Sequence, residues 1–432
     1  MSNLKFETLA LHAGQHKGGD DPSRAVSIAR TTAYNFRDTE HAANLFALKE
    51  LGYIYTRLQN PTQNALEERM AALEGGAASL ALASGTSAVF YSIINLAVAG
   101  DEIVSSKYLY GGTYTMFNNI LPDYGITVRF VDPLNLEEVE AAINEKTRAV
   151  YIETIGNPAL VVPDFEAIGD LAHRHRLPVI ADATFTTPYL LRSMDHGVDI
   201  VVNSLTKWIG GHGTGIGGAV VDSGRFDWKE LKFTTLNDPD GSYHGVRYAL
   251  DLGDLAPLAY ILRMRLVPLR NLGSAISPDN AWMFLQGMET LPLRMERHSQ
   301  NAHAVAEYLS KHPEVAWVSY PGLPSHASHE NAKKYLKRGF GGMVVFGING
   351  GRKAGEEFIN SLDLFSHVAN VGDAKSLAIH PASTTHSQLS DQQQRDAGLP
   401  PEMVRLSIGL EHVDDIIADI DAGLKRAKSA AA

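Results

Sequence analysis

The stretch of sequence that decides the fold is DIVVNSLTKWIGGHGTGIGG, residues 199–218. Its apolar run, 200–202, predicts a buried strand, which ends in polar residues that lead to Lys207 and then to glycines. A lysine at the end of a core strand is costly to bury unless it is paired or used covalently. Lys207 is therefore the first candidate functional residue. The alternative is a side chain that extends from the strand end to solvent.

Further apolar runs lie on both sides of this stretch and alternate with helical patterns. Strands are predicted at 79–83, 102–105, 127–131, 148–153, 178–182, 199–203 and 217–222, and the helical stretches between them include 136–144 and 164–175. This alternation predicts an α/β fold with a mostly parallel sheet that helices cover on both faces. Ligands in such folds bind beyond the carboxyl ends of the strands. The polar residues predicted at those ends are Ser84-Gly85, Glu153, Asn157, Asp182 and the run from Ser204 to Lys207.

The length of 432 residues favours more than one domain. Residues 1–60 show no clear periodicity and are expected to form an extended arm. Residues 61–290 are expected to form the large domain, which starts with a helix that begins at Pro61 and stops at Gly75. Residues 291–432 predict a smaller α+β domain, with helices near 292–311 and 413–428 and strands near 342–347 and 403–408.

The composition excludes several classes of function. The net charge of −11 and a pI of about 5.8 argue against a nucleic-acid or anionic-membrane partner. The chain has no cysteine, which excludes disulfides, thiolate metal sites and cysteine nucleophiles, and its 17 histidines form no HExxH-like set, so no metal is expected. The first residues lack a signal-peptide pattern, and a cytoplasmic protein is expected.

One uncharged segment, residues 75–100, is long enough to span a membrane. Ser84, Gly85 and Thr86 interrupt it, so a buried strand followed by a core helix over 86–98 is the better interpretation.

The polar groups at the predicted strand ends together suit one cofactor, pyridoxal phosphate. A lysine binds this cofactor covalently, a carboxylate keeps its pyridine nitrogen protonated, and hydroxyls with helix-end amides hold its phosphate. An aromatic ring commonly covers the cofactor ring. The residues that match these needs are Lys207, Asp182, Ser204, Thr206, Ser84, Gly85, Thr86 and Tyr110.

Two interpretations compete with an enzyme that binds pyridoxal phosphate. Residues 213–218 satisfy the GxGxxG pattern of nicotinamide dinucleotide sites, but the residues that follow predict a strand, whereas that motif should open a helix. The other alternative is a binding module that keeps the fold without the chemistry.

Here the chain resembles a family of pyridoxal-phosphate enzymes, those that replace or eliminate γ-substituents in cysteine and methionine metabolism. The resemblance covers nearly the whole chain. It rests on the motifs FETLALHAG, YTRLQNPT, SGTSA, YGGTY, ETIGNP, ADATFTTPY, SLTKWIGGH, GMETLPLRMERH, HPASTTHSQL and VRLSIGLE. It implies the aspartate-aminotransferase-like fold. Within the family, GGTYTMF, YHGVRY, ISPDNAWMFLQG and NVGDAKSLAIHPAS resemble the O-acetylhomoserine sulfhydrylase branch.

The resemblance implies a role for each candidate residue. Lys207 would carry the cofactor and, once freed, shuttle protons, while Asp182 would pair with the pyridine nitrogen and Tyr110 would stack on the ring. Arg405 would clamp the substrate α-carboxylate, near Asn157 and Asn370. The residues implied to hold the phosphate or its surroundings are Ser84, Gly85, Thr86, Ser204, Thr206, Asn157 and Thr184. Tyr55 and Arg57 would reach the phosphate of a neighbouring subunit, with Tyr55 also near the substrate, so the arm 1–60 would contact that subunit.

The branch implies γ-replacement on O-acetylhomoserine by sulfide or methanethiol, in a homotetramer built of dimers. Gly112 stands where methionine γ-lyases have cysteine, and Asn370 stands where lyases and cystathionine synthases have serine. Both departures favour the sulfhydrylase branch. The alternatives that remain are a γ-lyase, a cystathionine γ-synthase and an O-succinylhomoserine sulfhydrylase.

Overall fold

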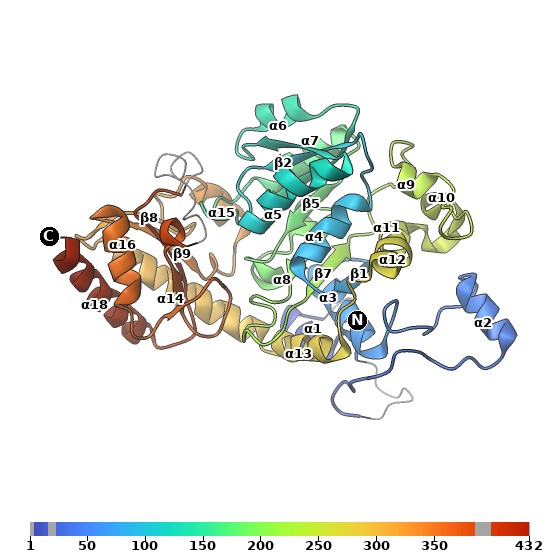
Figure 1. The fold of residues 1–432 in the computed structure, drawn as a ribbon, viewed down its shortest axis with the longest axis horizontal. Coiled ribbons are helices and arrows are strands. Elements are labelled where there is room, and N and C mark those ends of the chain that lie inside the picture. The colour runs from blue at the N-terminus through green and yellow to red at the C-terminus, as the bar shows by residue number, and fades with distance from the viewer. Residues whose placement is uncertain (1–3, 16–22, 385–398, 432) are drawn as a thin grey trace.

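The structure is a computed structural model that describes residues 4–15, 23–384 and 399–431. Figure 1 shows a larger α/β body, a smaller unit that carries the C-terminus, and a segment near the N-terminus that extends away from the body. Two sheets organise these parts, one of seven strands and one of five.

The seven-stranded sheet has the strand order β1-β7-β6-β5-β4-β2-β3, in which only β7 runs antiparallel to its neighbours. The predicted mostly parallel sheet is thus confirmed. Its strands are β1 (Ala78–Leu82), β2 (Glu102–Ser106), β3 (Thr127–Val131), β4 (Thr147–Glu153), β5 (Val179–Asp182), β6 (Ile200–Ser204) and β7 (Gly218–Asp222). Because β1, β2, β4, β5 and β6 are mutually parallel, their carboxyl ends meet at one edge of the sheet.

Both faces of this sheet are buried, as near-continuous apolar strands require. Side chains alternate along β6, so that Val201 joins one core cluster while Ile200 and Val202 join the other. The first cluster includes residues of α3 (Pro61–Glu74), α7 (Phe165–Arg174), α13 (Pro278–Glu289) and α14 (Leu291–Ser310). The second includes residues of α4 (Gly85–Ile94) and α11 (Ala259–Met264). The lesser helices here are α5 (Gly111–Thr115), α6 (Leu136–Ala142), α8 (Thr187–Leu190), α9 (Thr234–Asn237), α10 (Tyr248–Asp251) and α12 (Arg270–Leu272).

The uncharged segment 75–100 divides into β1 and α4, as its polar interruption predicted. Helix α4 ends at Ile94, earlier than the predicted 98, and is therefore too short to cross a bilayer. Among the described residues, no helix combines the length and the apolar character that a membrane span needs.

The second sheet has the order β10-β11-β12-β9-β8. Its strands are β8 (Val315–Ser319), β9 (Met343–Ile348), β10 (Ser366–His367), β11 (Leu377–Ile379) and β12 (Met403–Ser407). Its helices are α14, which connects it to the larger body, α15 (His329–Tyr335), α16 (Gly351–Asn360) and α18 (Val413–Ala431). This is the predicted α+β arrangement, although β8, β10 and β11 were not predicted.

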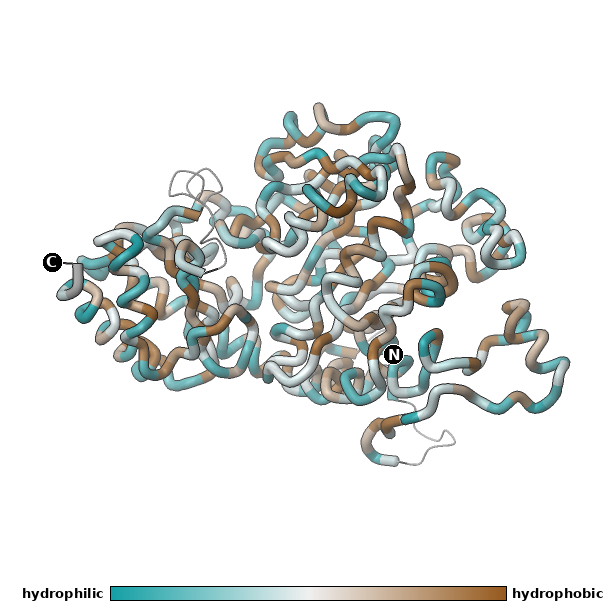
Figure 2. The backbone as a smooth tube through the Cα atoms, viewed as in Figure 1, coloured by the Kyte–Doolittle hydropathy of each residue, from teal (hydrophilic) through white to brown (hydrophobic). Residues whose placement is uncertain are grey.

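The N-terminal region, predicted as an extended arm over residues 1–60, begins with a helix that packs on the larger body. Helix α1 (Phe6–His12) packs against α3 and α13, and its Phe6 and Ala10 are buried. The extending segment begins later and carries α2 (Thr39–Phe46) at its tip (Figure 1). Hydrophobic positions occur along this segment as well as in the body (Figure 2), and the exposed ones include Phe36, Phe46 and Leu51.

Candidate active site

Lys207 lies in the turn that follows β6, at the edge where the parallel strands end. Its Nζ donates a hydrogen bond to Oδ1 of Asn370, at 2.5 Å. Partial burial lowers the pKa of Lys207, and the positive charge of Arg405 lowers it further. Both effects favour the neutral amine, which is the form that can act as a nucleophile or a base.

Arg294 of α14 holds the turn that carries Lys207 through hydrogen bonds to backbone carbonyls. This buried guanidinium donates to the carbonyls of Trp208 at 2.5 Å, Ile209 at 3.0 Å and Gly287 at 2.6 Å. Burial lowers the pKa of Arg294 to about 10. Arg294 was not identified from the sequence as a functional residue. The only feature of the sequence that could have indicated Arg294 is its place in the motif GMETLPLRMERH. No local pattern relates Arg294 to a turn more than 80 residues earlier in the chain.

Replacement of Arg294 by lysine should destabilise the protein without removing any group from the site. A single ammonium cannot serve carbonyls that lie in different directions, so at least one buried carbonyl would lose its donor. The expected loss in free energy of unfolding is about 2 kcal/mol, the cost of one unpaired buried polar group. Denaturant unfolding of both proteins measures it. An unchanged denaturation midpoint would show that the fork of Arg294 is dispensable.

Residues 370–374 pack against the same turn from the C-terminal part of the chain. Ala374 donates its N–H to the carbonyl of Gly211 at 2.9 Å. Gly372 adopts a φ of +78°, and a Cβ there would lie 2.6 Å from the backbone nitrogen of Trp208. Glycine at 372 thus allows the close approach that brings Asn370 to Lys207.

Asp182 is the last residue of β5 and lies beside Val202 of β6. Its Oδ1 accepts the N–H of Thr184 at 2.9 Å, and the hydroxyl of Thr184 accepts the N–H of Ser204 at 2.8 Å. Burial raises the pKa of Asp182. Within the described parts of the chain, no cationic side chain forms an ion pair with it. A half-buried carboxylate without a cation fits a ligand that brings a protonated nitrogen.

Helix α4 begins beside the end of β6 and offers an anion site. Ser84 caps this helix by accepting the N–H of Ser87 at 3.0 Å, while the amides of Gly85 and Thr86 have no acceptor among the described residues. A Cβ on Gly85 would lie 2.6 Å from Cβ of Ser204. Only glycine therefore lets the helix end approach Ser204 this closely. The donors gathered here suit a phosphate.

Thr206 lies in the same turn, but its hydroxyl already has partners in the chain. It donates to the carbonyl of Gly217 at 3.2 Å and accepts the N–H of Gly217 at 3.1 Å. These bonds join the turn to the residue before β7. The glycine pattern 213–218 therefore leads into a strand, not into the helix that a dinucleotide site needs.

Tyr110 and Asn157 lie beyond the ends of β2 and β4 and share a partner, Glu153. The carboxylate of Glu153 accepts the N–H of Tyr110 on Oε1 at 2.6 Å and the N–H of Asn157 on Oε2 at 3.2 Å. Tyr110 is 53% exposed, so it is accessible to a ligand. A Cβ at Gly112 would lie 2.5 Å from Cε1 of the Tyr110 ring, which makes Gly112 part of the position that the tyrosine occupies.

Arg405 comes from β12 of the smaller sheet, between Ile379 of β11 and Val345 of β9. Burial lowers the pKa of Arg405, and its positive charge lowers the pKa of Lys207, so the two side chains lie near one another. No carboxylate within the described residues pairs with it. A half-buried guanidinium without an anion suits the bidentate binding of a ligand carboxylate.

Tyr55 and Arg57 are not brought to this site in the single chain. They follow the extending segment, where the guanidinium of Arg57 lies 5.1 Å from the ring centroid of Tyr55, which is 40% exposed. Their predicted role therefore requires a second copy of the chain. The end of the motif HPASTTHSQL, residues 385–389, lies outside the described residues.

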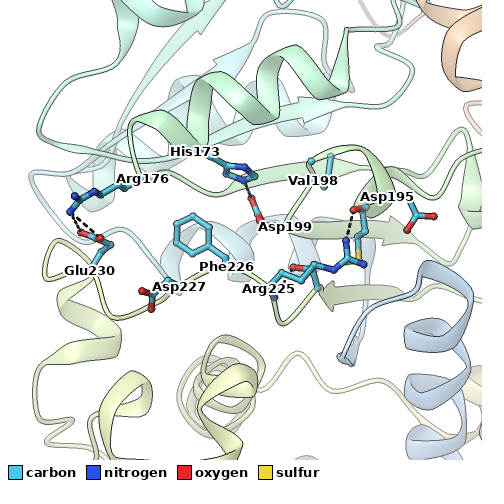
Figure 3. Close-up of a pocket in the computed structure, with 12 residues that line it drawn as sticks. His173, Arg176, Asp195, Val198, Asp199, Arg225, Phe226, Asp227 and Glu230 are labelled. Carbon is cyan, nitrogen blue, oxygen red and sulfur yellow. Dashed lines mark hydrogen bonds and ion pairs between the residues drawn. The ribbon is translucent and has the colours of Figure 1, made fainter. Parts of the chain in front are cut away.

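One cavity of the structure lies away from this site. It has a volume of about 390 Å³ and lies at the opposite edge of the sheet, where Asp199 precedes β6 and Ser223 follows β7 (Figure 3). Two ion pairs line it, His173 with Asp199 at 2.9 Å and Arg176 with Glu230 at 3.1 Å. The described residues contain no group of side chains arranged to hold a metal ion.

The site has the donors and acceptors that pyridoxal phosphate needs: a half-buried amine, a half-buried carboxylate without a cationic partner among the described residues, and a helix end beside a serine. Together with the sheet order, they define the class of the protein, a pyridoxal-phosphate enzyme of the aspartate-aminotransferase-like fold. A family model described as "Cys/Met metabolism PLP-dependent enzyme" matches residues 7–425. The chain belongs to this family.

Full-length relatives narrow the comparison. An O-acetyl-L-homoserine sulfhydrylase of Leptospira meyeri is 53% identical over 98% of this chain and 97% of its own. A homocysteine synthase of Schizosaccharomyces pombe is 52% identical over 97% of this chain and 98% of its own. A solved structure of a putative O-acetylhomoserine (thiol)-lyase from Campylobacter jejuni matches with a TM-score of 0.93 and 42% identity, over 98% of this chain and 100% of that one. That structure carries N'-pyridoxyl-lysine-5'-monophosphate at its position 205.

Proposed function

We propose that this enzyme catalyses a γ-replacement on O-acetyl-L-homoserine, in which sulfide displaces acetate and gives homocysteine. The C–O bond at the γ-carbon breaks and a C–S bond forms there. The observation that carries the proposal is the 50% or greater identity, over nearly the full length, to proteins named for this reaction. Methanethiol, which would give methionine, is the second sulfur donor that we propose.

Different residues of this chain would bind different parts of the cofactor. The amides of Gly85 and Thr86 and the hydroxyl of Ser204 would hold the cofactor phosphate, and Thr206 would join them by redirecting the hydroxyl proton that it donates to the carbonyl of Gly217. Ser84, Asn157 and Thr184 would support these contacts. Asp182 would hold the proton of the pyridine nitrogen, and the ring of Tyr110 would lie on the cofactor ring. Bound pyridoxal phosphate supplies an electron sink for the α-carbon of an amino acid.

Three side chains act on the substrate in this proposal. Arg405 binds the α-carboxylate and fixes the orientation of the α-carbon. Lys207, with its lowered pKa, takes the α-proton on Nζ and returns it to carbon later. Asn370, through its Oδ1, holds Nζ of Lys207 between these transfers. Asn157 and the partner-borne Tyr55 would complete the substrate pocket.

We also propose the assembly and the location. Tyr55 and Arg57 would contact the phosphate in a second copy, so the arm 1–60 would join two large domains (61–290), with 291–432 as the C-terminal domain. A tetramer built of two such dimers is the proposed assembly. The exposed side chains of Phe46, Leu51 and Tyr55 on the arm support an interface there. The cysteine-free composition supports a cytoplasmic location.

The test of the reaction is direct. Purified enzyme with pyridoxal phosphate, O-acetylhomoserine and sulfide should release homocysteine and acetate in equal amounts. O-succinylhomoserine and methanethiol, tried in all combinations, should define the preferred ester and sulfur donor by kcat/KM. Release of 2-oxobutanoate from methionine, at a rate comparable with homocysteine formation, would instead identify a γ-lyase.

A further inference from the structure

Glu153 connects parts of the active site that come from different strands. It is the last residue of β4, which lies between β2 and β5 in the sheet, and its side chain is buried with 6% of the residue exposed. Its two carboxylate oxygens serve different loops. Oε1 accepts from Tyr110, beyond β2, and Oε2 accepts from Asn157, beyond β4 itself.

The position of Glu153 relative to Asp182 is set by main-chain contacts. The two residues are register partners in the parallel β4–β5 pair. The next residue, Thr154, donates its N–H to the carbonyl of Asp182 at 2.9 Å, and its hydroxyl lies 3.0 Å from the hydroxyl of Thr186. The carboxylate that holds Tyr110 and Asn157 is therefore fixed to the strand end that bears Asp182.

The segments on either side of Glu153 have little freedom to move independently. A Cβ on Gly156 would lie 2.8 Å from Cβ of Tyr108 and 2.9 Å from its carbonyl oxygen, so the loops after β2 and β4 are in close contact. Glu153 lies beneath this contact and serves both loops. Its carboxylate joins the two loops through one hydrogen bond to each of them.

The charge around Glu153 shows that it is not held by an ion pair. Among the residues that the structure describes, no lysine, arginine or histidine forms an ion pair with it. Burial and the neighbouring Asp182 raise the pKa of Glu153. The amide donors of Tyr110 and Asn157 act in the opposite direction. A buried carboxyl beside another carboxyl is costly, and its presence at this place suggests that both of its acceptor oxygens have a function.

We propose that Glu153 is a positioning residue, which fixes Tyr110 and Asn157 against Asp182 so that the three enclose the cofactor ring. The inference deepens the proposed function, since it assigns Tyr110 and Asn157 to the cofactor. Glu153 itself touches neither substrate nor cofactor in this role. It acts through the backbone of the residues that do.

The experiment compares Glu153→Gln and Glu153→Ala with the wild-type holoenzyme. Glutamine keeps one acceptor and presents an amide donor to the other N–H, whereas alanine removes both acceptors. The expected result is a pyridoxal phosphate dissociation constant raised about tenfold in the glutamine variant and more in the alanine variant. The circular dichroism of the bound cofactor should weaken in the same order, because Tyr110 no longer has a fixed position over the ring.

Glu102→Gln is the matched control. Glu102 is also a buried carboxylate at a strand end, but it opens β2 at the opposite edge of the sheet and pairs with Arg129. The Glu102→Gln substitution should lower the thermal stability of the protein without changing the cofactor dissociation constant or the circular dichroism of the bound cofactor. If the Glu153 variants bind the cofactor as the wild type does, or change no more than Glu102→Gln, the inference is wrong.

The readout separates this inference from the proposed function. Cofactor affinity and dichroism need no substrate, so they test Glu153 even if the enzyme fails to form homocysteine. Conversely, homocysteine formation by the wild type, with unaltered cofactor binding in both variants, would uphold the function and reject the role of Glu153. If the alanine variant does not fold, the glutamine variant alone decides, since it changes a single acceptor.

Discussion

Replacement of Lys207 by alanine should reduce kcat for homocysteine formation about 10³- to 10⁴-fold, near the upper range for loss of a positioned general base. Nζ of Lys207 is half-buried and donates a hydrogen bond to Asn370. Its lowered pKa suits Lys207 for proton transfer at neutral pH. Borohydride reduction and peptide mapping should locate the cofactor on the 207 peptide in the wild type. The variant should retain no cofactor after this treatment and gel filtration in denaturant.

Lys232→Ala is the control for this change. Lys232 is also partly buried and has a lowered pKa, but it donates to the carbonyl of His175, at the edge opposite Lys207. Its loss should leave kcat unchanged. Borohydride labelling of any other peptide, with Lys207 unmodified, would reject the assignment of the cofactor lysine and the mechanism that depends on it.

Replacement of Arg405 by alanine should lower kcat/KM for O-acetylhomoserine on the order of 10²- to 10³-fold. The loss combines two charge-assisted hydrogen bonds to the substrate carboxylate, each worth roughly 1.5–3 kcal/mol, with partial compensation by water. Arg405→Lys should lose less, about 10- to 100-fold, since the charge remains but the bidentate geometry does not. Cofactor absorbance should be unchanged in both variants.

A substrate analogue gives the control for Arg405. The methyl ester of O-acetylhomoserine lacks the carboxylate, so the wild type should handle it as poorly as Arg405→Ala handles the normal substrate. The variant should not discriminate between ester and acid. A variant that still prefers the free acid by 100-fold would show that another group binds the carboxylate.

The sequence was sufficient for the main sheet because its central strands are buried on both faces. Mostly apolar runs marked the strands to within one residue, and even the edge strand β3, which is partly exposed, was predicted at its observed bounds. Helix α3 was equally clear, since Asn60 caps it, Pro61 begins it and Gly75 ends it with a φ of +74°. These features involve residues that are close together in the chain, so they can be recognised in a single sequence.

What the sequence did not predict depends on distant contacts. Helix α1 is short, and its burial depends on α3 and α13 rather than on its own periodicity. Strand β11 has only three residues, too few for a pattern. The carbonyl acceptors of Arg294 and the amide donors to Glu153 are backbone groups, which every residue possesses. No residue type marks them, so only coordinates could reveal these roles. The family resemblance supplied Arg405 and Asn370, which no local pattern relates to Lys207.

The register of β4, β5 and β6 has a consequence for the durability of the site. Glu153, Asp182 and Ser204 are each the final residue of a central strand, joined to its neighbours by ladder hydrogen bonds. Central strands open to solvent only when most of the molecule does, whereas surface turns open often. Glu153, Asp182 and Ser204 are therefore expected to keep their mutual spacing during local fluctuations. Amide hydrogen exchange in these strands should require global unfolding. Local opening of the loops beyond these strands would therefore leave the spacing of the three strand ends unchanged.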